Sequence, residues 1–382
     1  MNPHDWDQFL KRWTEEWLIA HPDLAGELTA GWPGYPPAST EQIATLEQRL
    51  GRPLPPSYRD FLQASNGWRF TIPFVDELRG ANDVGWLCDL DPSMAEIYDD
   101  SDIFEEEAAI LHRAVLISLE ADAGIIVLDP DDVNADGEWA VHELFSWSGE
   151  PTERHKSFYE WMYDSFASFH TLDRPSCRTQ REWDDRIEQA RLASLAGQVD
   201  APLHTLEQAH RFGRDRAGIL YFQLRVMLGI GDREASQWIE HPLTDTVNKN
   251  STWELDEPLL ATEFLPVLFD QHSRINPHLT QSCLAGFYER GIEPVKRLII
   301  DHRDRRKEPG FQLSYGNPEF DAAVRAIDFA GPDAWPLLHD ALPLWRPVSD
   351  DHLAPICLMA DPRIAPLITP ERGREILSTP RG

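Results

Sequence analysis

The sequence has few cysteines and no long hydrophobic run. Its 382 residues include four cysteines, Cys88, Cys177, Cys283 and Cys357, and no two of them form a C-x-x-C pair. This wide spacing indicates neither a metal knuckle nor a dense disulfide framework, so we expect reduced thiols. No apolar run approaches the roughly 18 residues of a membrane span, and no basic-then-apolar signal segment is present. We therefore expect a cytoplasmic protein that does not bind membranes.

Positive charge is also scarce. The chain has 35 Lys and Arg against 65 Asp and Glu, which gives a formal net charge of −30 at pH 7. Nucleic acids and anionic membranes are bound through clustered Lys and Arg, so this composition argues against both as direct partners. The excess of negative charge is uneven, since residues 1–177 have a net charge of −23 and residues 178–382 have a net charge of −7. The acidic first half favours a basic partner or serves solubility.

Signatures of common enzyme chemistry are missing. There is no G-x-x-x-x-G-K-[ST], G-x-S-x-G or H-E-x-x-H, and the glycines at residues 229–231 lie between predicted helices instead of following a strand. The histidines His302, His339 and His352 are scattered, and we interpret them as surface or capping residues. We expect a protein without catalytic residues and without a cofactor.

One stretch has clearly marked helix ends and turns. Ser39 followed by Gln42 is typical of a capping box, and apolar residues at helical spacing lead to Gly51, which favours a helix C-terminus. Prolines then force an extended passage, Pro56 suits the first turn of a second helix, and a turn is predicted at Asn66. The stretch predicts a helix, a proline elbow, a second helix and a tight turn.

The same stretch resembles the opening signature of the SUKH superfamily. The matching residues are Leu46, Glu47, Leu50, Gly51, Leu54, Pro55, Tyr58, Phe61, Leu62, Asn66, Gly67 and Trp68. The resemblance covers about residues 39–172 and implies an α+β domain. Many members of the superfamily are thought to be immunity proteins against bacterial toxins, and a fungal relative regulates cell-wall synthesis. The matching residues look structural within the family, so they indicate a fold without giving an active site.

Short β-rich runs follow this signature. They cover residues 69–75, 84–88, 114–119, 124–128 and 138–145. The connections between the last three runs are too short for crossover helices, so we expect a largely antiparallel sheet. An apolar helix from Phe158 to Phe169 would cover one face of it. With an N-terminal amphipathic helix over Trp6 to Trp17, which either packs on the core or exposes an aromatic face, these elements predict an α+β domain over residues 1–174.

The second half is predicted to be all-α. Helices are expected at residues 181–196, 202–212, 215–228, 233–239, 258–269, 277–290, 294–301, 318–329, 332–342, 350–359 and 370–377. Prolines open many of them and the linkers are short, as in helical hairpins. Similar segments at residues 334–338 and 364–368, with a looser copy at 293–299, favour HEAT-like repeats. We expect a helical-repeat domain over residues 175–382.

A calcium-loop pattern lies between two predicted strands. Its candidate oxygen ligands are Asp132, Asn134, Asp136 and Glu143, with Gly137 where the loop must turn. An EF-hand needs a helix on each side, whereas the flanking residues here predict strands. A β-hairpin loop explains the same residues through turn chemistry, so we favour a hairpin without a metal and keep calcium as the alternative.

Acidic residues are densest between residues 76 and 107, where Arg79 is the only Lys or Arg. The candidate partner-binding residues are Asp99, Asp100, Asp102, Glu105, Glu106 and Glu107. One interpretation is a solvated, mobile loop. The other is a patch that steers a basic partner, and a toxin that cleaves nucleic acid would be such a partner because its own cleft must attract phosphate.

From the resemblance and the acidic run, the first hypothesis is an immunity-type protein. It would neutralise a cognate bacterial toxin, for example a nuclease, by occluding the active site of a basic toxin domain. The alternative is a scaffold or regulator in which the helical array holds a protein partner. An enzyme with an unrecognised site is the third hypothesis.

Overall fold

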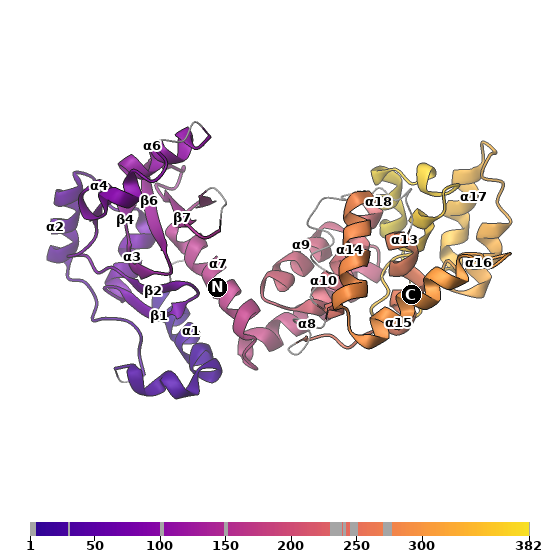
Figure 1. Ribbon diagram of the computed structural model, residues 1–382, viewed down its shortest axis with the longest axis horizontal. Coiled ribbons are helices and arrows are strands. Elements are labelled where there is room, and N and C mark those ends of the chain that lie inside the picture. Colours follow the sequence, from indigo (N-terminus) through magenta and orange to yellow (C-terminus); the bar gives the residue numbers. More distant parts are fainter. Residues whose placement is uncertain are drawn as a thin grey trace. The chain divides into compact units, whose positions relative to one another are not determined.

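The computed structural model describes residues 5–29, 31–99, 103–148, 152–229, 239, 242–244, 251–269 and 277–381. The chain divides into two compact units, residues 1–178 and 179–382. Figure 1 shows that the first unit combines strands with helices and that the second is built from helices. The predicted α+β and all-α classes are therefore confirmed. Within the described ranges, every helix is too short or too polar to span a membrane.

In the first unit, the helices α2 and α3 begin where the sequence predicts. Its helices are α1 (Trp6–Ala20), η1 (Pro22–Glu27), α2 (Thr40–Leu50), α3 (Pro56–Ala64), α4 (Leu87–Leu90), α5 (Pro92–Ala95), α6 (Glu105–Arg113) and α7 (Phe158–Asp173). The Ser39 hydroxyl accepts a hydrogen bond from the Gln42 backbone N–H at 3.2 Å, and the Gln42 side chain accepts one from the Ser39 N–H at 2.8 Å. Gly51 ends α2 in the left-handed region, at φ +70°. The capping box and the glycine stop are both present.

The strands form two antiparallel sheets. They are β1 (Trp68–Ile72), β2 (Val75–Leu78), β3 (Gly85–Trp86), β4 (Val115–Leu116), β5 (Ser118–Ala121), β6 (Gly124–Val133), β7 (Trp139–Phe145) and β8 (Glu153–His155). One sheet has the order β1-β2-β5 and the other the order β3-β4-β6-β7-β8. The longest pairing is β6 with β7, in which Gly124 lies opposite Phe145 and Leu128 opposite Val141.

Two predicted strands are in fact pairs of strands. The run at residues 69–75 is a hairpin, because β1 and β2 are joined by a turn at Pro73 and Phe74 and pair with Ile72 opposite Val75. Proline presets the backbone of the first central turn residue, which explains where the strand breaks. The run at 114–119 divides into β4, which pairs with β6, and β5, which pairs with β2. The chain thus passes from one sheet to the other within a few residues.

An aromatic core joins α1, α3 and α7. Trp6 contacts Phe61 with ring centroids 5.4 Å apart, and Phe9 contacts Phe166 edge-on at 5.4 Å. Phe158 lies 4.8 Å from Tyr58. All of these side chains are buried, so the aromatic face of α1 packs on the core and does not form an exposed surface. α7 also packs on β7, as predicted for the apolar helix.

The other face of the five-stranded sheet is covered by α4, α5 and α6. Leu111 of α6 packs in a buried cluster with Val127 of β6 and Leu144 of β7. The neighbouring residue Glu143 points the opposite way, toward Trp161 of α7, as the alternation of a strand requires. Residues 105–113 are therefore a packed helix and not a mobile acidic loop, which corrects the first interpretation of this part of the acidic run.

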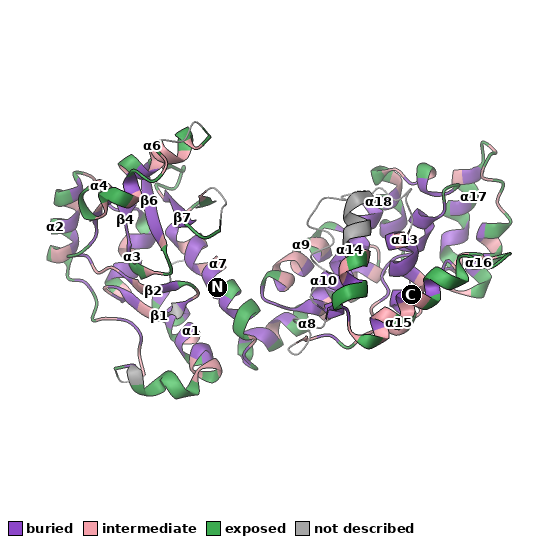
Figure 2. Cartoon of the chain, viewed as in Figure 1, coloured by how far each residue is buried: buried purple, intermediate pink, exposed green. Residues whose placement is uncertain are grey.

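The second unit is organised around a buried helix. Its helices are α8 (Arg178–Leu195), α9 (Asp200–Arg211), α10 (Asp215–Met227), α12 (Glu257–Leu259), η3 (Leu260–Phe264), α13 (Leu265–Phe269), α14 (Pro277–Arg290), α15 (Glu293–Arg305), α16 (Pro318–Arg325), α17 (Ala334–Ala341), η4 (Leu342–Leu344), η5 (Ile356–Ala360), η6 (Ala365–Leu367) and α18 (Pro370–Ser378). Figure 2 shows α10 buried among them, and it contacts α9, α18 and η5. A helix buried on all sides needs no amphipathic pattern.

Polar contacts across long sequence separations hold this unit together. The Gln223 side chain on α10 donates to the Asp351 carbonyl at 2.7 Å and accepts from the Leu353 N–H at 2.7 Å. Arg381 is buried and donates to the carbonyl oxygens of Ser194, at 3.0 Å, and Leu353, at 2.9 Å. Arg381, which follows α18, thus connects the end of α8 with the segment near Leu353.

Two of the predicted helices are not found as α-helices among the described residues. Residues 350–359 do not form an α-helix, because Pro355 lacks an N–H and only the short 3₁₀ helix η5 follows it. The helix expected at 233–239 lies outside the described residues except for Ile239. Of the two most similar segments, residues 334–338 open the α-helix α17, whereas 364–368 contain the 3₁₀ helix η6. The HEAT-like repeat stays a prediction.

Candidate protein-binding surface

The acidic run ends in the first turn of α6. Glu105, Glu106 and Glu107 form that turn, and His112 and Arg113 lie in the last one. This placement of charge favours the helix, because acids stabilise the N-terminus of a helix and bases its C-terminus. Among the described residues, none forms an ion pair with the three glutamates. Their charge is therefore available to a partner.

The other predicted contacts lie just before α6. The Asp99 carboxylate is 2.7 Å from Nε2 of His112, which ties this residue to the C-terminal turn of α6. The rings of Tyr98 and Phe104 contact each other at a tilt, with centroids 4.7 Å apart, and so bring the two ends of the intervening segment together. Asp100 and Asp102 lie outside the described residues.

The acids at the end of β6 are already neutralised. Asp129 is buried and accepts two hydrogen bonds from Arg113, at 2.9 and 2.6 Å. Burial alone would raise the pKa of Asp129, but Arg113 and the Asp131 backbone N–H hold it below the ordinary value. Asp132 accepts two hydrogen bonds from Arg154, and the nearer is 2.6 Å long. These carboxylates stabilise the fold and have little charge left for a partner.

The calcium-loop residues form the β6–β7 hairpin. The Asn134 carbonyl accepts from the Gly137 N–H at 3.1 Å, and the Asn134 side chain accepts from the N–H groups of Asp136, at 2.9 Å, and Glu138, at 3.1 Å. Of the other candidate ligands, Asp132 bonds Arg154, and Glu143 accepts from the indole N–H of Trp161 at 2.7 Å. Burial raises the pKa of Glu143. Strands flank this loop, and the side-chain oxygens of Asp132, Asn134 and Glu143 each bond a different group of the protein.

An exposed aromatic patch was missed by the sequence prediction. It consists of Phe74, Phe145 and Trp147, whose ring centroids lie 5.4 to 6.0 Å apart. Phe74 is 49% exposed and Trp147 54%, whereas Phe145 is buried. The Trp147 indole N–H donates to the Asp122 carbonyl at 2.8 Å, which fixes the ring. The proline in the run 69–75 is the signal that could have shown a turn with an exposed residue after it.

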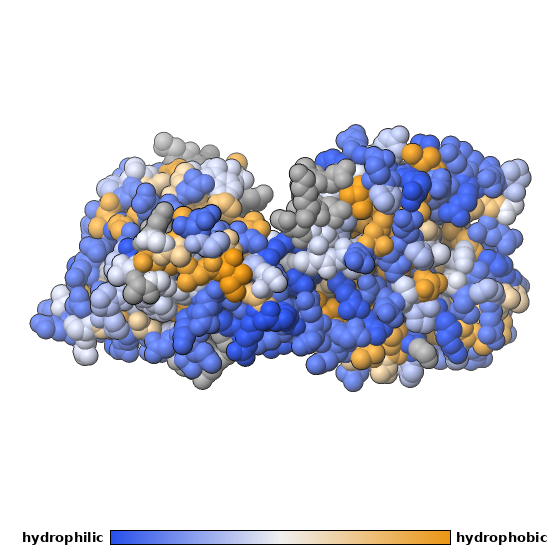
Figure 3. All heavy atoms as spheres, turned by 90° about the horizontal axis from the view of Figure 1, so that it is seen from below, coloured by the Kyte–Doolittle hydropathy of each residue, from blue (hydrophilic) through white to orange (hydrophobic). Residues whose placement is uncertain are grey.

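An exposed acidic residue lies beside this aromatic patch. The Asp122 N–H donates to the Phe74 carbonyl at 2.9 Å, so the exposed Asp122 lies beside the patch. The strand pairing places Glu77 of β2 between Glu120 of β5 and Arg69 of β1, so Glu77 has a like charge on one side and a cation on the other. Figure 3 shows apolar surface on the first unit with hydrophilic surface beside it. Exposed aromatic residues with a charged rim are typical of protein-binding sites.

Antiparallel sheets covered by helices define a domain of the α+β class. Residues 37–169 match the SMI1 / KNR4 family (SUKH-1). The first unit therefore contains a domain of the SUKH superfamily, and the predicted resemblance is confirmed. The family match does not extend into the helical unit. No curated protein and no solved structure matches the chain.

Proposed function

We propose that the protein is a cytoplasmic immunity-type protein that binds a basic bacterial toxin domain, such as a nuclease, and occludes its active site. The SUKH match carries this proposal, because immunity proteins are common in that superfamily. The site chemistry supports it, since the matched domain presents both unpaired acids and exposed aromatic residues. Binding of this kind is stoichiometric and requires no catalytic group.

The acids of α6 and the aromatic patch would contribute differently. Exposed charges mainly raise the association rate, and this effect weakens as salt screens them. Aromatic anchors that become buried in the complex mainly slow dissociation. Glu105, Glu106 and Glu107 would therefore steer the toxin, and Phe74 and Trp147 would hold it.

The test begins with capture of partners on the intact protein from its native cells at low salt. A captured basic protein is purified, and its toxic activity is titrated with the immunity protein. We expect complete inhibition at a one-to-one ratio. Trp147→Ala should raise the dissociation rate and weaken binding by about 2 kcal/mol, or roughly 30-fold.

The acids are tested by changing Glu105, Glu106 and Glu107 together to Gln. The association rate should fall about tenfold at low salt, and its salt dependence should flatten. A control with the exposed residues Asp7→Asn, Glu15→Gln and Glu41→Gln has the same change in net charge and should behave like the natural sequence. Capture of several unrelated proteins through residues 179–382, insensitive to salt, would refute the proposal in favour of a scaffold.

A further inference from the structure

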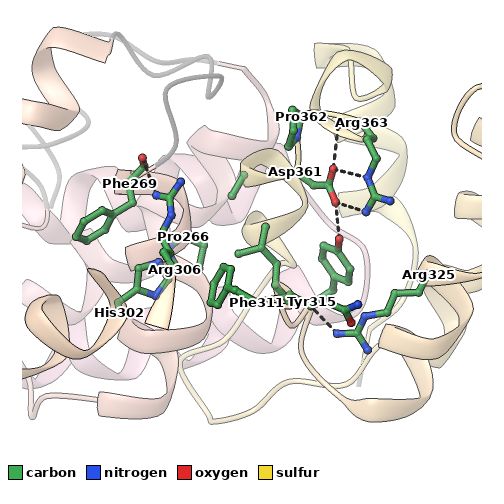
Figure 4. A pocket seen from close by; sticks show the side chains of 13 residues that line it. Pro266, Phe269, His302, Arg306, Phe311, Tyr315, Arg325, Asp361, Pro362 and Arg363 are labelled. Carbon is green, nitrogen blue, oxygen red and sulfur yellow. Dashed lines mark hydrogen bonds and ion pairs between the residues drawn. The ribbon is translucent and has the colours of Figure 1, made fainter. Parts of the chain in front are cut away.

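The helical unit contains a cavity of about 710 Å³ between α13, α15 and the segment that includes η5 (Figure 4). Its lining includes the arginines Arg306, Arg325 and Arg363 and the aromatic residues Phe269, Phe311 and Tyr315. The volume lies within the range of roughly 300–1,000 Å³ that is usual for small-molecule sites. All of the lining residues belong to the second unit, so the cavity is independent of the surface described above.

The charge of this cavity is opposite to that of the whole chain. Three guanidinium groups line it, and among the described lining residues Asp361 is the only acid. Asp361 is fully engaged, because it accepts from Arg363 at 3.0 and 2.7 Å and from the Tyr315 hydroxyl at 2.6 Å. In a chain of net charge −30, such a concentration of arginine indicates a site for an anion.

Of the three arginines, Arg306 has the most N–H donors available to a ligand. One of its N–H groups donates to the Phe269 carbonyl at 2.9 Å, and its guanidinium lies over the Phe269 ring at 5.7 Å. Within the described part of the chain, no carboxylate forms an ion pair with it. Arg325 bonds the Leu313 carbonyl at 2.8 Å and Asp321 at 3.2 Å. Since a guanidinium has five N–H donors, both arginines can bind further acceptors.

His302 adds a polar group that the fold does not use. The sequence interpretation of His302 as a surface residue is wrong, because it is 2% exposed. It lines the cavity, and its Nε2 has no hydrogen-bond partner among the described residues. Burial, with smaller effects from Arg306 and Arg305, lowers the pKa of His302 to about 4, so the ring is neutral at pH 7. A buried nitrogen without a partner costs free energy unless something bonds it, and a ligand in the cavity would do so.

The aromatic side chains provide flat apolar faces beside these polar groups. Phe269 and Phe311 lie 5.1 and 6.0 Å from the His302 ring, measured between centroids. Figure 4 shows the rings of Phe311 and Tyr315 in the same lining as the arginine side chains. A ligand that combines a planar ring with an anionic group would use both kinds of surface.

We propose that this cavity binds a nucleotide. Arg306 binds its phosphate, the aromatic residues contact its base, and His302 Nε2 forms a hydrogen bond with it. The size of the cavity, the excess of guanidinium groups and the unused buried nitrogen carry the inference together.

The test is isothermal titration calorimetry of the full chain with AMP, GMP, CMP, UMP, adenosine and inorganic phosphate. We expect micromolar affinity for at least one nucleotide, and much weaker binding of phosphate or nucleoside alone. Arg306→Gln should weaken nucleotide binding at least about tenfold. Arg303→Gln, an exposed position on α15 whose partner is Asp304, is the matched control and should change nothing.

Phe311→Leu keeps an apolar side chain. It should also weaken the binding of the nucleotide, but not the binding of phosphate. Circular dichroism establishes that each variant is folded. Absence of binding by every compound at millimolar concentration would overturn the proposal. So would nucleotide binding that Arg306→Gln leaves intact, or phosphate binding as tight as that of the nucleotide.

Discussion

Phe74 has a backbone conformation that aromatic residues rarely adopt. Its φ is +62°, at the turn position where glycine or asparagine is usual after a proline. An L-residue with a side chain is strained there, by about 1–2 kcal/mol. Such strain persists where the side chain is needed, and here it holds a half-exposed ring against Phe145 and Trp147. The strain supports a role for this aromatic patch in binding.

Replacement of Phe74 can distinguish the effect of its backbone strain from the effect of its ring contacts. Phe74→Gly and Phe74→Ala both remove the ring, but only glycine removes the strain. We expect Phe74→Gly to be about 1 kcal/mol more stable than Phe74→Ala, as measured by urea denaturation. Both should bind the proposed toxin partner more weakly than the natural sequence does. Equal stability of the two variants would show that the turn relaxes around alanine.

Individual elements differ in how far the sequence determines them. The helix α2 could be predicted with its ends because Ser39, Gln42 and Gly51 act on their own backbone neighbours. The helix α6 could not, because its stability depends on packing of Leu111 against β6 and β7, which only the tertiary structure brings together. The cavity could not be predicted for the same reason, since His302 and Arg363 are distant in sequence and only the fold brings them into one lining.

The cap of α2 offers a measurement of local stability. Ser39→Ala removes the side chain that accepts from the Gln42 N–H, and we expect it to lower the free energy of unfolding by about 1 kcal/mol. Thr45→Ala, at an exposed position within the same helix, is the control and should be neutral or slightly stabilising because alanine favours helices. Chemical denaturation of both variants gives the values. If Thr45→Ala lowered the free energy of unfolding as much as Ser39→Ala does, a role for the cap would be contradicted.

At the scale of the whole molecule, each unit has its own core and its own proposed site. The aromatic core of the first unit joins α1, α3 and α7, and the second unit packs around α10. We expect residues 1–178 and 179–382 to fold as separate fragments, with cooperative thermal transitions in circular dichroism. The first should retain toxin binding and the second nucleotide binding. Loss of the near-ultraviolet spectrum in either fragment would show that its fold depends on the other.

The long-range contacts of the second unit bear on the order of events during translation. Gln223 bonds residues near position 352, and Arg381 bonds Ser194, so the helical unit lacks key partners until its last residues have left the ribosome. The first unit is complete some two hundred residues earlier. Because domains generally fold as they emerge, the SUKH domain is expected to reach its native state while the helical unit is still being made. A newly synthesised chain would then be able to bind a toxin before its own synthesis is finished.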